Sequence, residues 1–180
     1  MPAKPKQKTL LPRLFIGSSS EAKEAGIPQA FAKSLRDDAV VISWWEAPEF
    51  TPMFGTLESL LEISNQYDIG LFILTPDDST VSRGKKHESA RDNVLFEMGL
   101  FLGKLGRART FAVVQGAATS TKRVKILSDA EGIHIPRFTP GDEHETISSI
   151  HGAADAIRAA IKKQGRKRPQ LKLLSARSYQ

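Results

Sequence analysis

The sequence predicts an α/β protein, with a parallel sheet of about five strands and helices on both of its faces. Short apolar runs rich in β-branched residues alternate about five times with longer segments of helical periodicity. That order is typical of a parallel sheet covered by helices. The run Ile69–Leu74 is apolar throughout, as expected for a strand buried on both faces. A length of 180 residues suits one domain.

The first strand and the first helix are predicted near the N-terminus. Arg13–Gly17 has the composition of a buried strand, and a helix is expected over residues 21–35. Ser18 stands three residues before Glu21, which is the spacing of a helix capping box. Pro28 is expected either to kink this helix or to begin its main part.

The middle of the chain continues the alternation. We expect a second strand over Ala39–Trp44 and a loop with two prolines over Glu46–Phe54. A helix follows over Thr56–Tyr67, and the apolar strand Ile69–Leu74 comes next. Thr75–Arg91 is rich in charged and turn-forming residues, so we expect a polar loop there.

The last part of the chain completes the predicted sheet. The apolar spacing predicts a strong helix over Asp92–Leu105 and a fourth strand over Phe111–Val114. A loop is expected over Gly116–Lys122 and a short fifth strand over His134–Phe138. The last helix is predicted over Glu145–Lys163.

Charge divides the chain into an acidic body and two basic ends. We expect a domain over residues 13–164, a basic extension over residues 1–12 and a basic tail or linker over residues 165–180. All 20 acidic residues lie between Leu14 and Asp155, beside 14 of the 26 Lys and Arg residues. Basic ends are consistent with contact to nucleic acid or an anionic membrane. A solvated tail is the more ordinary interpretation, and we expect no nucleic-acid partner.

Composition also limits the function classes. Cys is absent, which excludes disulfides, thiolate metal sites and a Cys nucleophile. No apolar run approaches the roughly 20 residues of a spanning helix, and residues 1–8 do not look like a secretory signal. We therefore expect a cytoplasmic protein without a membrane span. The four histidines lack metal-ligand spacing, and no GxSxG motif occurs, so we expect no metal.

In a parallel sheet, ligands bind beyond the carboxyl ends of the strands, where the strand order switches. The first loop at that edge is small and rich in hydroxyl groups. Gly17, Ser18 and Ser19 precede a predicted helix whose free N–H groups favour a phosphate. An ordinary serine helix cap is an equally good interpretation, because neither a GxGxxG fingerprint nor a P-loop is present.

Two other loops at this edge carry distinctive residues. Trp44, Trp45 and Phe50 offer an aromatic face for a base or a pyridine ring, although core packing also accounts for them. Asp77 and Asp78 are adjacent carboxylates. Neighbours in sequence rarely converge on one metal ion, so we favour a turn over a metal site here.

The helix after the polar loop carries the most informative residue. Glu97 interrupts an otherwise apolar helix face, where a carboxylate is costly unless it is paired or used. Asn93 lies four residues earlier on the same face. An ion pair with Arg91, Lys104 or Arg107 is the structural alternative, and we favour a functional role for Glu97.

Three blocks of the sequence resemble a known family. They are RLFIGSSSE, WWEAPEFTPMFGTLESLLEISNQYDIGLFILTPDD and ARDNVLFEMGLFLGKLGRARTFAVV, in that order. They resemble the bacterial TIR-like proteins described as predicted nucleotide-binding, which include TIR effector domains of the CBASS and Pycsar antiphage systems. The resemblance covers about Arg13 to Phe138. It implies a flavodoxin-like TIR fold and an NAD+ glycohydrolase.

The resemblance also implies roles for particular residues. Its catalytic glutamate maps to Glu97, and its first-strand loop maps to Gly17, Ser18 and Ser19, which would line the nucleotide pocket. NAD+ is then the substrate and no separate cofactor is expected. Further substrate contacts are expected from residues that follow the strands or begin the helix of Glu97, namely Trp45, Phe50, Asp77, Arg91 and Asn93.

One carboxylate is sufficient for this chemistry. Nicotinamide leaves as a neutral base, so no general acid is needed, unlike in glycoside hydrolysis. The carboxylate stabilises the ribosyl cation electrostatically. The resemblance further implies a homo-oligomer or filament built through TIR–TIR contacts, with a cyclic-nucleotide sensor or another protein as activator.

Other functions stay open at this point. A noncatalytic TIR scaffold would need no glutamate at position 97. A nucleoside deoxyribosyltransferase-like enzyme would use the same glutamate on a nucleoside. A nucleic-acid binder acting through the basic ends would lose affinity steeply with salt.

Overall fold

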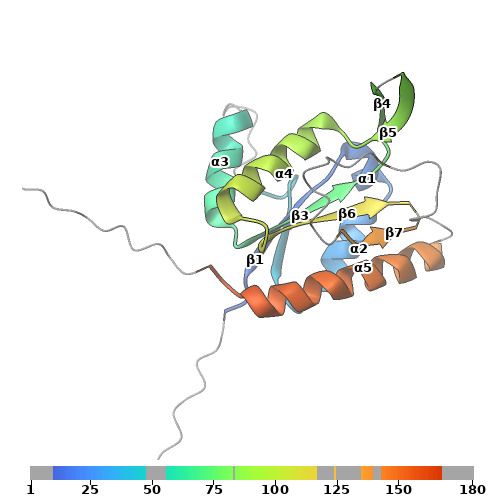
Figure 1. The fold of residues 1–180 in the computed structure, drawn as a ribbon. Helices are drawn as coiled ribbons and strands as arrows, with labels where there is room; N and C mark the ends of the chain where they lie inside the picture. The colour runs from blue at the N-terminus through green and yellow to red at the C-terminus, as the bar shows by residue number, and fades with distance from the viewer. Residues whose placement is uncertain are drawn as a thin grey trace, which may run out of the picture.

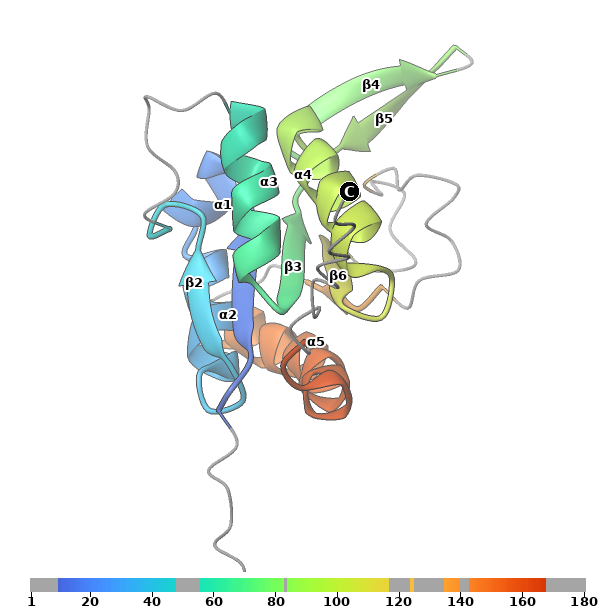
Figure 2. The same cartoon turned by 90° about the vertical axis from the view of Figure 1, so that its left-hand side faces the viewer.

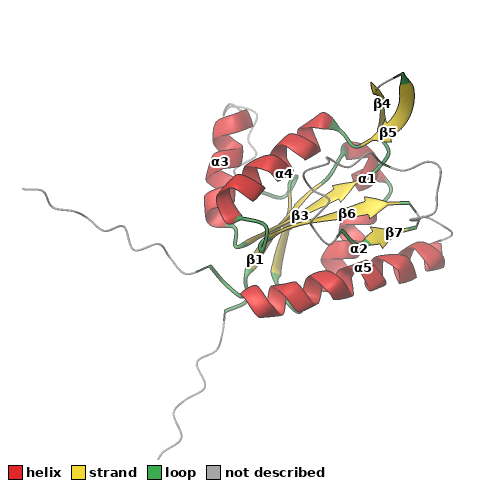
Figure 3. Ribbon diagram, in the orientation of Figure 1, coloured by secondary structure: helices red, strands yellow, loops and turns green. Residues whose placement is uncertain are grey.

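The computed structural model describes residues 10–47, 56–82, 84–116, 124, 135–139 and 143–167. Five parallel strands form its main sheet, in the order β2-β1-β3-β6-β7 (Figures 1 and 3). The strands are β1 (Arg13–Gly17), β2 (Val40–Ser43), β3 (Ile69–Leu74), β6 (Thr110–Gln115) and β7 (Arg137–Phe138). The predicted α/β class with a five-stranded parallel, flavodoxin-like sheet is confirmed.

Side-chain alternation along the strands divides the core into two layers. In β1, Leu14 and Ile16 belong to one apolar cluster, whereas Phe15 belongs to the other. In β3, Leu71 belongs to the first cluster and Phe72 to the second, and all six residues of the strand are buried. Burial on both faces explains why the strand reads as a continuous apolar run.

Helices cover both faces of the sheet (Figures 1 and 2). One face packs against α1 (Ser20–Glu24), α2 (Ile27–Leu35) and α5 (Glu143–Gln164). The other face packs against α4 (Asp92–Leu105), and α3 (Thr56–Gln66) lies beside α4. None of the helices within the described ranges is long and apolar enough to cross a membrane.

The predicted first helix is divided into α1 and α2. Gly26 has a φ of 73°, a conformation that favours glycine, and Pro28 lies in the first turn of α2. Pro28 therefore begins the main helix rather than kinking it. The cap of α1 differs from the prediction, because Ser19 rather than Ser18 accepts a hydrogen bond, at 3.1 Å, from the backbone N–H of Ala22.

The predicted polar loop Thr75–Arg91 is wrong over most of its length. It forms an antiparallel hairpin of β4 (Asp78–Ser82) and β5 (Lys85–Ser89), which projects from the body next to the start of α4 (Figure 2). Ser82 pairs with Lys85, and Gly84 in the connection has a φ of 72°, as a two-residue hairpin turn favours. A ribbon without a buried face needs no apolar alternation, so the sequence pattern resembles a loop.

The remaining boundaries agree closely with the predictions. The helix Asp92–Leu105 and the strands Arg13–Gly17 and Ile69–Leu74 match residue for residue. The fifth strand is shorter than predicted and contains only Arg137 and Phe138 among the described residues. Residues 48–55, which hold most of the predicted proline loop, and most of the predicted loop 116–122 lie outside the described residues.

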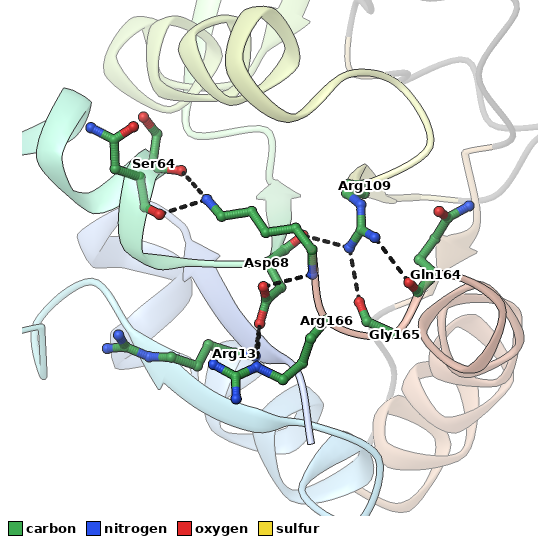
Figure 4. A network of polar contacts seen from close by, with 9 residues as sticks. Arg13, Ser64, Asp68, Arg109, Gln164, Gly165 and Arg166 are labelled. Atoms are coloured by element: carbon green, nitrogen blue, oxygen red, sulfur yellow. Dashed lines mark hydrogen bonds and ion pairs between the residues drawn. The ribbon is translucent and has the colours of Figure 1, made fainter. Parts of the chain in front are cut away.

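A buried aspartate joins the beginning and the end of the described chain at the amino edge of the sheet (Figure 4). Asp68 is 4% exposed. One of its carboxylate oxygens accepts from the backbone N–H of Arg13 at 2.8 Å, and the other accepts from the backbone N–H of Lys167 at 2.9 Å. Arg166 adds an ion pair at 3.8 Å. The carboxylate thus holds the start of β1 and the segment after α5 together.

Two basic side chains extend this junction. Arg109, before β6, donates to the carbonyl oxygens of Gly165 at 2.8 Å and Gln164 at 2.9 Å. Lys167 Nζ donates to the carbonyl of Asn65 at 2.5 Å, at the end of α3. Burial lowers the pKa of Lys167. A cation at a helix C-terminus compensates the unpaired carbonyl groups there.

We predict that Asp68→Ala lowers the free energy of unfolding by about 3 kcal/mol, because two partly buried backbone N–H groups lose their acceptor and Arg166 loses its ion-pair partner. Urea denaturation measures the change. Asp37→Ala alters an exposed aspartate after α2 and is expected to change the stability by less than about 0.5 kcal/mol. Equal effects of the two substitutions would contradict the structural role of Asp68.

Candidate functional site

The carboxyl ends of β1 and β3 define the candidate site. Strand β2 lies on one side of β1, and the next strand of this sheet along the chain, β3, lies on the other side. Gly17 pairs with Phe72 at this end. The segments that follow the two strands, Gly17–Ser19 and Thr75–Asp77, therefore lie side by side. In open α/β sheets, such a switch in strand order is where ligands bind.

Helix α4 brings Glu97 to this switch point. Val94, Met98 and Phe101 are buried on the helix face that packs against the sheet, with the spacing of an amphipathic helix. Glu97 lies on the same side and is half-buried. Packing of its apolar neighbours thus fixes the direction in which the carboxylate points.

The carboxylate of Glu97 lies directly against the end of β1. A Cβ atom placed on Gly17 would lie 3.3 Å from Glu97 Oε2 and 2.6 Å from two ring atoms of Phe72. Phe72 is fully buried and packs against Phe15 and Phe101, so its ring has little room to move. Only glycine at position 17 leaves the space that this approach requires.

Glu97 has the electrostatics of an unpaired, desolvated carboxyl group. Within the described ranges it forms no ion pair, and the alternative of a pair with Arg91, Lys104 or Arg107 is wrong. Burial raises the pKa of Glu97 from 4.5 to about 7, because the charged form loses solvation. A carboxyl group in this state is typical of functional sites.

A chain of hydroxyl groups connects the two segments of the switch point. Ser19 Oγ lies 3.2 Å from Thr75 Oγ1, and Thr75 Oγ1 donates to Asp77 Oδ2 at 2.5 Å. Ser18, Ser19 and Thr75 are buried, at 6%, 5% and 3% exposed. Ser18 Oγ donates to the carbonyl of Ser19 at 3.3 Å. These contacts unite the predicted Ser18, Ser19 and Asp77 in one cluster.

Arg91 lies at the start of α4, beside the first loop. It forms an ion pair with Glu21 and a longer one, at 3.8 Å, with Asp78. A hydrogen bond at its own backbone and one to Arg91 lower the pKa of Glu21. All three side chains are partly exposed, so these pairs stabilise the fold little. Asn93 is exposed one turn before Glu97.

The two tryptophans follow β2, on the other side of β1 from β3. Their rings meet edge to face at 5.7 Å between centroids, and Lys23 Nζ lies 5.0 Å from the centroid of Trp45. Both rings are half-buried. Phe50, the remaining aromatic residue of this prediction, lies outside the described residues.

Sequence reasoning missed the connecting residue of the cluster. Thr75 carries no signal of its own in the sequence, because its role comes from the register that sets β3 beside β1. Glu21 and Lys23, which contact Arg91 and Trp45, were likewise not predicted as site residues. Among the described side chains, no three His, Asp or Glu residues gather as a metal site.

Comparison with known proteins agrees with this fold. Residues 13–140 match the family model described as "CAP12/Pycsar effector protein, TIR domain". A prokaryotic SEFIR domain of known structure superposes with a TM-score of 0.50 at 16% identity, covering 89% of this chain and 96% of that one. The flavodiiron core of Flv1 from Synechocystis gives a TM-score of 0.52, also at 16% identity, covering 88% and 38%. Likeness at such identity concerns the fold alone.

Similar curated proteins share about a third of the aligned residues. A CD-NTase-associated protein 12 from Niabella drilacis is 34% identical over 152 residues, covering 82% of this chain and 46% of its own length. The Pycsar effector protein PaPycTIR from Pseudomonas aeruginosa is 34% identical over 155 residues, covering 86% and 48%. The chain thus spans slightly less than half the length of these relatives.

Two glycines give a matched test of the close approach at Gly17. We predict that Gly17→Ala lowers the free energy of unfolding by about 1–3 kcal/mol, because the added Cβ overlaps the Phe72 ring. Gly99→Ala adds the same atom on α4 with nothing within 4 Å. It is expected to raise stability by up to about 1 kcal/mol through helix propensity. Thermal and urea denaturation of both variants measure these changes. A Gly17→Ala variant as stable as wild type would contradict the close approach of the Phe72 ring to Gly17.

The raised pKa of Glu97 predicts a pH-dependent stability. In the native state the Glu97 carboxyl group keeps its proton up to about pH 7. In the unfolded state the same group loses its proton near pH 4.5. Stability from this group is therefore present at low pH and is lost as pH rises through that window. Glu97→Gln is expected to stabilise the protein by about 2 kcal/mol at pH 8, and the gain disappears toward pH 4.5.

Urea denaturation at several pH values measures this difference. Glu24→Gln, at an exposed glutamate of α1, serves as the control and should show no such pH-dependent gain. If the difference in the free energy of unfolding between Glu97→Gln and wild type were the same at pH 5 and pH 8, the desolvation of Glu97 would be contradicted.

Proposed function

The chain belongs to the CAP12/Pycsar family of TIR effector domains, and we propose that it cleaves the nicotinamide–ribose bond of NAD+ as an effector of antiphage defence. The observation that carries this proposal is the position of Glu97. Its carboxylate is half-buried, free of ion pairs within the described ranges, and beside the end of β1 at the switch point.

Glu97 supplies the charge that the proposed reaction requires. As the bond between ribose C1′ and the pyridinium nitrogen breaks, its electron pair stays with nicotinamide, which leaves neutral. Positive charge then develops on the ribose, and a nearby carboxylate stabilises it. Water adds to C1′ and releases a proton, which completes hydrolysis to ADP-ribose; attack by the adenine ring instead would give a cyclised product.

The desolvation of Glu97 strengthens this effect. Charges attract more strongly where water is excluded, and the buried Phe72 ring lies beside the same Gly17 position as the carboxylate. The pyridinium charge of NAD+ would favour the ionised form of Glu97. The residue is therefore protonated in part when the site is empty and ionised when the cationic substrate is bound.

The neighbouring residues are assigned to substrate binding. We assign Gly17 and Ser18 to contact with the ribose and phosphates, because their loop begins beside Glu97. We assign Arg91 to the phosphates, because its cation lies at the start of α4. Trp45 and Phe50 offer rings for stacking. Asn93 completes the residues that we assign to substrate contact, and Ser19 and Asp77 support the site through their hydrogen bonds to Thr75.

Assembly and activation are part of the proposal. We expect homo-oligomers or filaments through TIR–TIR contacts. We also expect a cyclic-nucleotide signal upstream, because relatives are named as Pycsar effectors or CD-NTase-associated proteins. A sensor of that signal, on the same or another chain, would bring the domains together. Activity at low protein concentration is then expected to be small.

We predict that the protein releases nicotinamide from NAD+ at a rate that rises faster than linearly with protein concentration. Glu97→Gln is expected to lower kcat at least about 100-fold, as loss of one electrostatic stabiliser typically does. Because the ionised carboxylate is needed, kcat/KM should rise with pH and level off above about pH 7. Nicotinamide is quantified by chromatography, with Glu24→Gln as the exposed control.

Three results would contradict the proposal in different ways. Equal activity of wild type and Glu97→Gln removes Glu97 from the reaction. Base exchange between free nucleosides without NAD+ cleavage indicates a deoxyribosyltransferase-like enzyme. Absence of activity at high concentration, with cyclic nucleotides and candidate activating proteins present, indicates a scaffold.

A further inference from the structure

The hydroxyl chain at the switch point has a fixed direction. Thr75 has one hydroxyl proton and donates it to Asp77. In the contact between Ser19 and Thr75, Ser19 must therefore be the donor. Ser19 Oγ in turn accepts from the backbone N–H of Ala22. The order of donors is thus Ala22, Ser19, Thr75, with Asp77 as the final acceptor.

This direction separates the two serines of the first loop. The proton of Ser19 is committed to Thr75, so Ser19 cannot donate to a ligand while the chain is intact. Among the described residues, the Ser18 hydroxyl makes only a long bond of 3.3 Å to a carbonyl, and Ser18 is the serine that can exchange its partner for a substrate oxygen. Ser19 is therefore suited to holding the loop, and Ser18 to touching substrate.

Thr75 is the member that connects the loop to the rigid part of the sheet. It follows β3, whose six residues are all buried, and it is itself 3% exposed. A β-branched side chain has few rotamers, so its hydroxyl is held in one place. Through Ser19 it fixes the loop that begins at Gly17, where an added Cβ would lie 3.3 Å from Glu97 Oε2.

We propose that Thr75 is a positioning residue for the cleavage reaction, which acts through Ser19 to hold the Gly17–Ser19 loop at its distance from Glu97. Asp77 sets the direction of the chain by accepting the proton of Thr75. The inference rests on the proposed function and adds to it a division between residues that hold the loop and residues that touch substrate.

Another buried threonine shows that burial alone does not require this arrangement. Thr110 is 1% exposed at the opposite, amino end of β6, and its hydroxyl has no hydrogen-bond partner within the described part of the chain. The same substitution at the two positions therefore separates loss of the hydroxyl chain from loss of a buried hydroxyl in general.

The kinetic test uses Thr75→Val, Thr75→Ser and Thr110→Val in the full chain. Thr75→Val keeps the shape but removes the hydroxyl, and we expect it to raise the KM for NAD+ about tenfold with kcat changed less than about threefold. Thr75→Ser should restore KM to within about threefold of wild type, and Thr110→Val should leave it unchanged. A wild-type KM for Thr75→Val, or a Thr75→Ser variant as impaired as Thr75→Val, would overturn the inference.

A second readout does not depend on activity. The N–H of Ala22 is bonded to Ser19 Oγ, so its hydrogen exchange, measured by NMR without NAD+, reports whether the loop is held. We expect exchange about tenfold faster in Thr75→Val and near wild type in Thr75→Ser and Thr110→Val. Faster exchange in a protein that cleaves no NAD+ would overturn the proposed function but support the hold on the loop. Unchanged exchange in an active protein would overturn the role of Thr75.

Discussion

The architecture of the site depends on the absence of a side chain at Gly17. Helix α4 crosses the sheet with Phe101 and Met98 buried beneath it, and the Phe72 ring fills the space above the end of β1. Any Cβ at position 17 would compete with that ring and with the carboxylate of Glu97. A second glycine, Gly70, gives the same relief at the other end of β3, where an added Cβ would lie 2.5 Å from Phe101. Close packing in a protein interior leaves no slack for such atoms. The position of the carboxylate is therefore a result of core packing rather than of polar contacts.

The two edges of the sheet hold carboxylates in contrasting environments. At the amino edge, Asp68 satisfies backbone donors of two distant segments and is itself satisfied. At the carboxyl edge, Glu97 has no such partner among the described residues, and burial raises its pKa to about 7. Asp68 is buried and Glu97 is half-buried, yet among the described residues only Asp68 holds distant segments together through hydrogen bonds. An unpaired buried charge is costly, and proteins keep such costs mainly where a ligand later provides the compensating charge.

Much of this arrangement could be predicted from the sequence. Strands β1 and β3 and helix α4 are strongly periodic, and Glu97 is visible as one charge on an apolar helix face. The hairpin β4–β5 could not be predicted in the same way, because neither of its strands covers the core and its pattern is that of a loop. Thr75 was missed for a different reason. Its bond to Asp77 is local, but its other partner, Ser19, lies 56 residues away and reaches it only through the pairing of β1 with β3. No local pattern encodes that contact.

The shared acceptor at Asp68 has a consequence for how the domain combines with other chains. The backbone N–H groups of Arg13 and Lys167 bind the two oxygens of the Asp68 carboxylate. The first strand and the segment after the last helix therefore lie next to each other. Domains whose ends lie together can be joined to other modules without stretching their core. Asp68 lies at the amino edge of the sheet, and Glu97 lies at the carboxyl edge. A module joined at Arg13 or at Lys167 would therefore be attached at the edge opposite the candidate site. The two ends of the described domain and the candidate site therefore lie at opposite edges of the sheet.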